Sequence, residues 1–178
     1  SYAVFSPGRN YEQIRTTIAY NDANAKIAGA HAGISVGPDG ATHQATEDMA
    51  IMRAMPNMKV FCPCDSVEAK KATLAAAKIF GPVYLRFGRE KVPVITTEAT
   101  PFAAGEAQIF WDPAPKKKGE AAIIACGHLV YEALVAAKHL AEKEKIEIYV
   151  INSPSVKPLD ERLILEIGKK VGAIVTAE

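Results

Sequence analysis

The chain has 178 residues, and its 21 Lys and Arg residues against 20 Asp and Glu residues give a formal net charge of +1. Such a balance lacks the electrostatic footprint of a nucleic-acid-binding protein or of one that docks on an anionic membrane. Hydrophobic residues make up 49% of the sequence, which is typical of a folded protein with a sizeable core and excludes a disordered one.

Strand and helix signals alternate through residues 1–92. Residues 31–43 are predicted to form a loop, because three glycines and a proline interrupt any regular element there. The alternation is typical of the α/β class, with a parallel sheet and crossover helices. Strands are expected at residues 25–30, 58–61 and 82–87, and helices at residues 11–20 (capped by Asn10), 42–55 (capped by Thr42) and 65–81 (opened by a capping box of Asp65 and Glu68).

Prolines punctuate residues 93–119, which we expect to link two domains and to hold one short strand at residues 107–111. The lysine run at residues 116–118 is expected to be a solvated face of that linker. Residues 120–178 return to the alternation and predict a smaller α/β domain that is incomplete at its end. Its strands are expected at residues 121–126, 146–151 and 173–177, and its helices at residues 128–143 and 160–170, the second capped by Asp160.

Three cysteines, Cys62, Cys64 and Cys126, are an odd number and form no disulfide framework. Cys62 and Cys64 are separated by one residue and have no second cysteine pair, so we expect buried thiols rather than a metal or redox site. No apolar run approaches the roughly 18–20 residues of a membrane span, and no charged-then-apolar leader opens the chain. We therefore expect a cytoplasmic protein with neither a membrane nor a nucleic-acid partner.

The loop after the first strand carries the residues best suited to catalysis. It runs His31-Ala-Gly-Ile-Ser-Val-Gly-Pro-Asp39-Gly-Ala-Thr-His43, at the carboxyl end of a strand, where α/β folds build ligand sites. Its two histidines titrate near neutral pH and can pass protons to hydroxyl and carbonyl oxygens, while Asp39 can orient an imidazole. These residues alone leave a ligand site and a set of structural loop histidines both open. A metal site is less favoured, because no third ligand follows at helical spacing.

The segment around this loop resembles a known signature. It reads HAGISVGPDGATHQATEDMAIMRAMPN, and it is similar to the pyrimidine-domain signature of the transketolase family, thiamine-diphosphate enzymes that move two-carbon ketol units. The segments SYAVFSPGRNYEQIR, PVYLRFGRE, GHLVYEALVAAKHL and SVKPLD resemble further parts of that family, so the resemblance covers nearly the whole chain. It implies a pyrimidine-binding domain over residues 1–92, incomplete at its N-terminus, and the family's C-terminal domain over residues 120–178.

Two alternatives accompany this interpretation. A 1-deoxy-D-xylulose-5-phosphate synthase has a similar GxDGxTHQ motif but usually lacks a histidine at the position of His31. A non-catalytic assembly subunit of a thiamine enzyme would keep the fold for subunit contacts alone. Such a subunit has no physical need for His31, Asp39 and His43 together, so an active transketolase is favoured.

The resemblance implies cofactor-binding residues in the first segment. Phe5 matches the aromatic residue that packs on the aminopyrimidine ring of the cofactor, and stacking suits a flat heteroaromatic group. Tyr2 is a second aromatic candidate. Arg9 and Tyr11 are weaker matches, because this segment holds an extra residue relative to the family.

The resemblance also assigns catalytic and substrate-binding residues. His43 matches a catalytic, cofactor-binding histidine near the amino group of the cofactor and the substrate carbonyl. His31 matches a second catalytic position that also binds substrate. Asp39 and Arg89 match substrate-binding positions, Arg89 as the arginine that holds the phosphate. Arg86 lies three residues earlier, and it would take the phosphate-binding position of Arg89 if the loop aligned with the family in a different register.

Other parts of the implied site lie outside this chain. The cofactor is thiamine diphosphate, and its Mg²⁺ or Ca²⁺ is expected on a diphosphate-binding domain, so no metal ligands are expected here. The glutamate that activates the aminopyrimidine is also expected outside these residues. The expected partners are sugar phosphates of the pentose phosphate pathway and the diphosphate-binding domain or subunit, in a homodimer or a heterotetramer.

Overall fold

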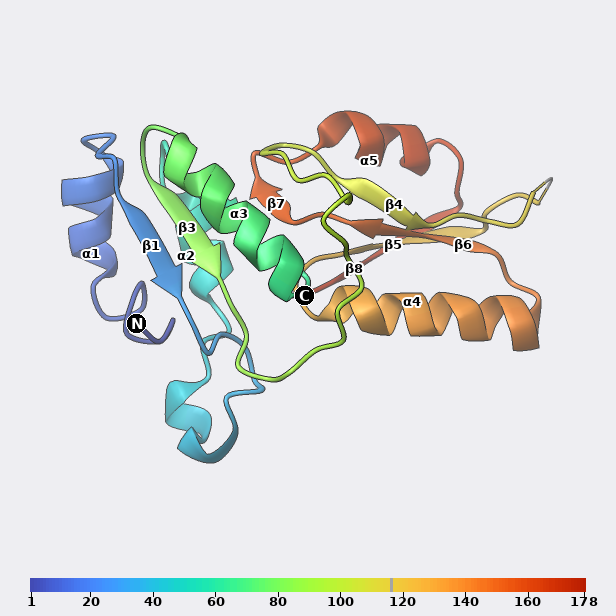
Figure 1. Ribbon diagram of the computed structural model, residues 1–178, viewed down its shortest axis with the longest axis horizontal. Coiled ribbons are helices and arrows are strands. Elements are labelled where there is room, and N and C mark those ends of the chain that lie inside the picture. Colours follow the sequence, from blue (N-terminus) through green and yellow to red (C-terminus); the bar gives the residue numbers. More distant parts are fainter. Residues whose placement is uncertain (116) are drawn as a thin grey trace.

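A computed structural model describes residues 1–115 and 117–178, and its described residues form two α/β sheets of four strands each (Figure 1). Strand order is β1 (Lys26–Gly29), β3 (Val83–Arg86), β2 (Lys59–Phe61), β7 (Ser155–Lys157) in the first sheet and β4 (Gln108–Trp111), β6 (Ile148–Asn152), β5 (Ala121–Ala125), β8 (Ala173–Ala177) in the second. The helices are α1 (Tyr11–Gln13), continued as a π-helix over Ile14–Ala19, α2 (Asp48–Ala54), α3 (Ser66–Lys78), α4 (Leu129–His139), continued as a π-helix over Leu140–Glu144, and α5 (Glu161–Gly168).

Helices cover both faces of the first sheet. On one face, Met49 and Met52 of α2 belong to the same buried cluster as Tyr84 of β3. On the other face, Ala72 of α3 packs with Leu85. Because successive strand residues point to opposite faces, Tyr84 and Leu85 serve the two layers, and all four residues of β3 are buried. This is the fully covered sheet that parallel strands require.

The second sheet is covered in the same way, with α4 and α5 on opposite sides of its strands (Figure 1). Val130 of α4 packs with Val150 of β6, and Ile167 of α5 packs with the neighbouring Ile151. The expected α/β class of both sheets is therefore confirmed. Asp160 caps α5 as expected, since its Oδ1 accepts a hydrogen bond from the N–H of Leu163 at 3.0 Å.

The two halves exchange more structure than the sequence predicts. The segment expected as a linker contributes β4, which pairs antiparallel with β6 in the second sheet. β7 lies in the second half of the sequence but belongs to the first sheet. It pairs antiparallel with β2, in a register that places Lys157 opposite Val60. The Nζ of Lys157 then donates hydrogen bonds to the carbonyl oxygens of Arg53 and Met55, at 2.8 and 2.6 Å. β7 has only three residues between two prolines, which is too short to show the alternation of apolar and polar residues that indicates a strand. The sequence therefore did not predict it.

Two expected helix caps differ from the structure. Asn10 stands at the N-cap position of α1 as expected, but its side chain donates to Ser6 Oγ and makes no capping hydrogen bond. Thr42 lies in a 3₁₀ turn over Ala41–His43, and α2 begins only at Asp48. The reason is that the N–H of Gly33 donates to the carbonyl of Ala45 at 2.8 Å, which holds the chain extended just before the helix.

Other boundaries differ by a few residues. Apart from the start of α2, the largest shift of a boundary is at the end of α3, which lies at Lys78 rather than at residue 81. The strand expected at 146–151 runs from Ile148 to Asn152. Lys116, part of the expected lysine run, lies outside the described residues, while Lys117 pairs with Glu147 at 2.6 Å.

Asp65 ties α3 to the segment between the two halves. Its Oδ1 accepts from the N–H of Glu68 at 2.8 Å, which confirms the expected cap, and the return contact of the Glu68 carboxylate goes to the N–H of Cys64 at 2.7 Å. Asp65 Oδ2 accepts from the backbone N–H groups of Ile95 and Thr96, at 2.8 and 2.6 Å. Burial opposes the charge of Asp65, but these hydrogen bonds outweigh it and hold the pKa below its ordinary value.

Replacing Asp65 with Ala is expected to lower the free energy of unfolding by about 3 kcal/mol. The change removes a helix cap and leaves the N–H groups of Ile95 and Thr96 without their acceptor. Because the pKa of Asp65 is lower in the folded state, its contribution is present above the unfolded pKa of about 3.9 and is lost as the pH falls through the folded value. Denaturant titration of the intact protein at pH 7 measures the loss.

The control for this prediction is Glu98→Ala, which removes an exposed ion pair with Lys70 of 3.1 Å. Exposed pairs contribute little, so the free energy of unfolding should change by no more than about 0.5 kcal/mol. An Asp65→Ala variant as stable as this control would contradict the role assigned to Asp65.

Candidate functional site

The loop that follows β1 is the part of the first half that extends farthest from its sheet (Figure 1). Its first turn is held by the N–H of Ala32, which donates to the carbonyl of Phe87 at 3.0 Å, and its two ends are joined by the bond from Gly33 to Ala45. Two short 3₁₀ turns, over Gly37–Asp39 and Ala41–His43, shape the tip. The loop is thus anchored at the carboxyl end of β3.

Four of the expected site residues meet in one aromatic cluster, which we call the Tyr2–His43 cluster: Tyr2, Phe5, His31 and His43. The ring of Tyr2 stacks on that of His31, with centroids 4.1 Å apart and planes 11° from parallel. The ring of His43 meets that of Phe5 edge-on at 5.2 Å and that of Tyr2 at 6.0 Å. Arg9 also reaches the cluster, since its Cζ lies 4.9 Å from the centre of the Phe5 ring.

His31 is held in an unusual state within this cluster. Its φ is +57°, the left-handed region that residues with a Cβ seldom adopt. Its Nδ1 is buried, and no described residue hydrogen-bonds to it. A buried polar atom without a partner is costly, and such features gather at functional sites. The ring is therefore placed to accept or donate one hydrogen bond to a bound molecule.

His43 is oriented by its neighbour. Its Nδ1 lies 2.9 Å from the hydroxyl oxygen of Thr42, so that its other ring nitrogen is left for a ligand. Proton transfer at that nitrogen suits a histidine, whose two ring nitrogens can exchange roles.

The loop tip brings two further candidates together. Arg89 Nη1 lies 3.4 Å from Asp39 Oδ2 and also donates to the carbonyl of Val36. Both side chains of this ion pair are about one-third exposed, at 36% for Arg89 and 34% for Asp39. Arg89 is thus within reach of a solute, and it is fixed in direction by the loop.

Two other candidates lie apart from the cluster. Tyr11 begins α1 and packs, partly buried, against the core that contains Met52. Arg86 is buried and points to α2, where its Nε donates to both carboxylate oxygens of Asp48, at 3.2 and 3.0 Å. Arg89 therefore reaches the loop tip, whereas Arg86 is bound to Asp48 and its guanidinium lies near Gly33 at the start of the loop.

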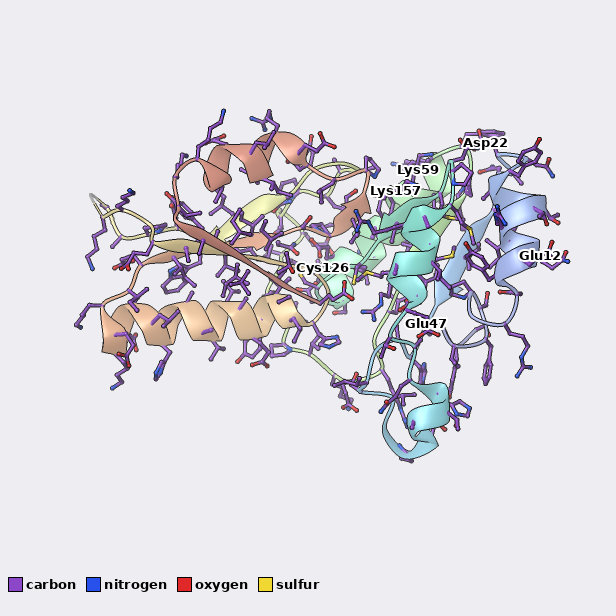
Figure 2. The ribbon with its side chains drawn as sticks, turned by 180° about the vertical axis from the view of Figure 1, so that it is seen from behind. Glu12, Asp22, Glu47, Lys59, Cys126 and Lys157 are labelled. Atoms are coloured by element: carbon purple, nitrogen blue, oxygen red, sulfur yellow. The ribbon has the colours of Figure 1, made fainter. Side chains whose placement is uncertain are left out.

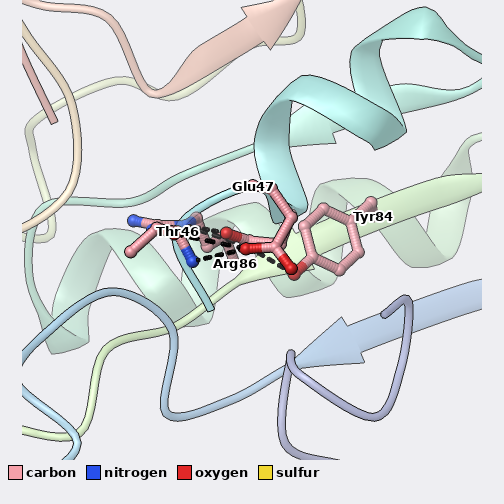
Figure 3. A network of polar contacts seen from close by, with 5 residues as sticks. Thr46, Glu47, Tyr84 and Arg86 are labelled. Carbon is pink, nitrogen blue, oxygen red and sulfur yellow. Dashed lines mark hydrogen bonds and ion pairs between the residues drawn. The ribbon is translucent and has the colours of Figure 1, made fainter. Parts of the chain in front are cut away.

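A buried polar network beneath the loop escaped the sequence analysis. Tyr84 donates its hydroxyl to Asp48 Oδ2 at 2.7 Å, next to the ion pair with Arg86, and Figure 3 shows Tyr84 and Arg86 approaching the residues that begin α2, beside Thr46 and Glu47. Burial raises the pKa of Tyr84, and the Asp48 carboxylate raises it further. The only available signal was the alternation of Tyr84 and Arg86 with apolar neighbours, which does not name their partner.

Gly29 makes room for this network. A Cβ at Gly29 would lie 2.1 Å from the Tyr84 hydroxyl oxygen, which is far inside a van der Waals contact. A residue with a side chain there would push Tyr84 away from Asp48. The glycine on β1 is therefore a packing requirement.

The sequence matches the models of two known protein domains. Residues 1–94 match the family described as transketolase, pyrimidine binding domain, and residues 114–178 match transketolase, C-terminal domain. The chain belongs to the transketolase family.

Several relatives cover almost all of this chain. It is 40% identical, over its full length, to a Methanocaldococcus jannaschii protein described as a transketolase C-terminal section, and 36% identical to a 6-deoxy-6-sulfo-D-fructose transketolase subunit of Clostridium sp.. It covers 54% and 53% of those two proteins. Human transketolase is 36% identical over 96% of this chain, which spans 27% of the human protein. The chain thus spans about half the length of its shorter relatives.

Solved structures show the same fold. A split gene transketolase, described as an inactive beta4 tetramer, superposes with a TM-score of 0.88 at 40% identity over 99% of this chain and 56% of that one. Transketolase from Campylobacter jejuni superposes with a TM-score of 0.79 at 24% identity, which shows the fold alone.

The residues of the Tyr2–His43 cluster fit the pyrimidine half of thiamine diphosphate, the cofactor that membership of this family implies. They offer aromatic faces to a flat ring, and the unpartnered Nδ1 of His31 and the free ring nitrogen of His43 offer hydrogen bonds. Among residues 1–115 and 117–178, no three His, Cys, Asp or Glu side chains are grouped closely enough to hold a metal ion. No helix in the described part of the chain is long and apolar enough to cross a membrane.

Replacing Asp48 with Ala is expected to lower the free energy of unfolding by about 3–5 kcal/mol, because it leaves the Arg86 charge buried without its partner. Tyr84→Phe removes one hydrogen bond and is expected to cost about 1 kcal/mol. Urea titrations of the two variants of the intact protein measure both values. If the two variants lost the same free energy of unfolding, the Arg86 charge would not depend on Asp48 as its buried partner.

Proposed function

We propose that this chain provides the pyrimidine side of a thiamine-diphosphate site and part of the sugar-phosphate pocket in a transketolase. The reaction would be the transfer of a two-carbon ketol unit between sugar phosphates. The observation that carries this proposal is the Tyr2–His43 cluster, in which two aromatic rings and two histidines face one another and one buried imidazole nitrogen lacks a partner among the described residues.

Within the proposed site, the protein binds, orients and moves protons. Phe5 and Tyr2 would pack on the aminopyrimidine and exclude water from it, with Arg9 supporting Phe5 from outside. When bound, the cofactor supplies the carbanion that takes up the two-carbon fragment. His43 would hold or transfer a proton at the substrate oxygen where negative charge develops, through the ring nitrogen that faces away from Thr42. His31 would bind a hydroxyl of the sugar at its buried Nδ1.

The phosphate end of the substrate is assigned to Arg89. A guanidinium offers paired donors to a phosphate, and Arg89 is held in the loop by the carbonyl of Val36. Asp39, 3.4 Å from it, would accept hydrogen bonds from sugar hydroxyls. The burial of Arg86 against Asp48 supports the choice of Arg89 between the two. Tyr11 has no comparable support, and its role at the cofactor stays a prediction.

The proposal requires a partner. The diphosphate of the cofactor and its Mg²⁺ or Ca²⁺ would be held by a diphosphate-binding domain or subunit, in a homodimer or a heterotetramer. A relative described as an inactive tetramer of one kind of chain supports the need for that second part. We place the reaction in the pentose phosphate pathway. We also propose a cytoplasmic location, which the three free, buried cysteines support because the cytoplasm keeps thiols reduced. Domain boundaries at residues 92 and 119 stay predictions.

The direct test is ketol transfer by the intact protein in its native assembly, with thiamine diphosphate, magnesium and a pentose-phosphate pair. His43→Ala is expected to lower kcat/KM by about 100-fold or more, as loss of a general acid–base group does. His139→Ala, which removes an exposed histidine from the end of α4, is the matched control and should leave the rate unchanged.

The same assay separates the alternatives. No ketol transfer, together with condensation of pyruvate and glyceraldehyde phosphate, would assign the chain to the 1-deoxy-D-xylulose-5-phosphate synthases. No activity with either substrate set would leave a non-catalytic assembly subunit as the better description.

A second test addresses Arg89. Arg89→Ala is expected to raise KM for a phosphorylated donor by about 10-fold or more, because a charge-assisted contact to phosphate is lost, and to change kcat less. The KM for a donor without phosphate should stay the same. Arg15→Ala, at an exposed arginine of the first π-helix, is the control. Equal effects on both donors would remove Arg89 from the phosphate site.

A further inference from the structure

Two cysteines meet where the two halves of the molecule join. Cys62 follows the end of β2 in the first sheet, and Cys126 follows the end of β5 in the second. They are 2% and 8% exposed and belong to the same buried cluster. Figure 2 shows Cys126 at the junction between the two halves. Both cysteines are buried, as expected from the sequence, and the proposed transketolase chemistry uses neither of them.

The backbone holds these two cysteines against each other. The N–H of Gly127 donates to the carbonyl of Cys62 at 3.0 Å, and the neighbouring Cys126 lies in the same buried cluster as Cys62. Gly127 has a φ of +60°, and a Cβ there would lie 3.0 Å from the Sγ of Cys62. Only a residue without a side chain lets the two strand ends approach so closely.

The surroundings of the two thiols differ in a way that suits one as a nucleophile. A hydrogen bond from the Cys126 thiol and the nearby Arg86 guanidinium lower the pKa of Cys62, against the effect of burial. The same hydrogen bond, together with burial, raises the pKa of Cys126. Cys62 is therefore the thiol of the pair that loses its proton more readily, and Cys126 is the one that keeps it.

Each cysteine of the pair lines a cavity of its own. Cys62, with Arg86 and His128, lines a cavity of about 450 Å³ between the two halves. Cys126 lines a second hollow of about 470 Å³ near β8. Cys64 lines the first cavity too, but burial and the adjacent Glu68 raise its pKa, so it stays a neutral thiol.

We propose that Cys62 and Cys126 form an oxidisable thiol pair, which a small hydroperoxide converts into a disulfide between the two halves of the chain. The Cys62 sulfur attacks the peroxide as its thiol proton is lost, so that an S–O bond forms, the O–O bond breaks, and an alcohol or water leaves with that proton. The Cys126 sulfur then attacks the sulfenic acid of Cys62. The S–S bond forms, the S–O bond breaks, and water leaves with the proton of Cys126.

The disulfide would lock the junction. It would join residues 62 and 126 covalently at the point where the carboxyl ends of β2 and β5 face each other, and it would draw Cys62 away from its contact with Arg86. Because it closes a long loop of the chain, it is expected to stabilise the fold against heating.

The test exposes the intact protein, in its native assembly, to a few equivalents of hydrogen peroxide and maps its peptides without reduction. The expected product is a peptide pair linked through Cys62 and Cys126, with the midpoint of thermal unfolding raised by about 5 °C and restored by dithiothreitol. Cys64→Ser should give the same product. Cys126→Ser, whose hydroxyl can still donate a hydrogen bond to Cys62, should instead leave Cys62 as a sulfenic acid that dimedone traps.

The wild-type peptide map decides the pairing even where a variant folds poorly. A bond between Cys62 and Cys64, oxidation of Cys62 beyond the sulfenic acid without a disulfide, or unreacted thiols at peroxide concentrations that fully oxidise an unstructured cysteine peptide in the same solution would each overturn the proposal. None of these outcomes depends on ketol transfer, so the thiol pair and the proposed function are tested separately.

Discussion

The buried ion pair between Asp48 and Arg86 is the constraint on which the candidate site depends. It joins the first residue of α2 to the last residue of β3, and Tyr84 completes it with a hydrogen bond of 2.7 Å. The loop that bears His31 and His43 is suspended between these elements, since it is anchored to Phe87 at one end and runs into α2 at the other. A shift of α2 against β3 would therefore move both histidines.

Much of the architecture was predictable because it rests on local signals. Most strands of the two sheets are runs of apolar residues between turns, and the caps Asp65 and Asp160 are acidic residues at the expected offsets. The start of α2 was not predictable, because the long-range bond from Gly33 to Ala45 overrides the local capping signal of Thr42. The pairing of β7 with β2 is likewise a contact between distant segments.

The candidate site, too, has features that the sequence predicted and features that only the structure reveals. The resemblance to the transketolase signature named Tyr2, Phe5, His31 and His43, and the structure brings their rings together. The resemblance left Arg86 and Arg89 exchangeable, and the structure separates them by burying Arg86. Neither the left-handed backbone of His31 nor its unpartnered nitrogen could be read from the sequence, because both arise from the three-dimensional arrangement around the ring.

The measurement that tests the central claim most directly is a structure of the assembled protein with thiamine diphosphate bound. The account predicts the aminopyrimidine ring packed against Phe5, with the free ring nitrogen of His43 within hydrogen-bonding distance of the cofactor or substrate. It also predicts that the loop from His31 to Ala45 keeps its present shape. A cofactor bound away from this cluster, with Phe5 and His43 covered by a partner chain alone, would contradict the account.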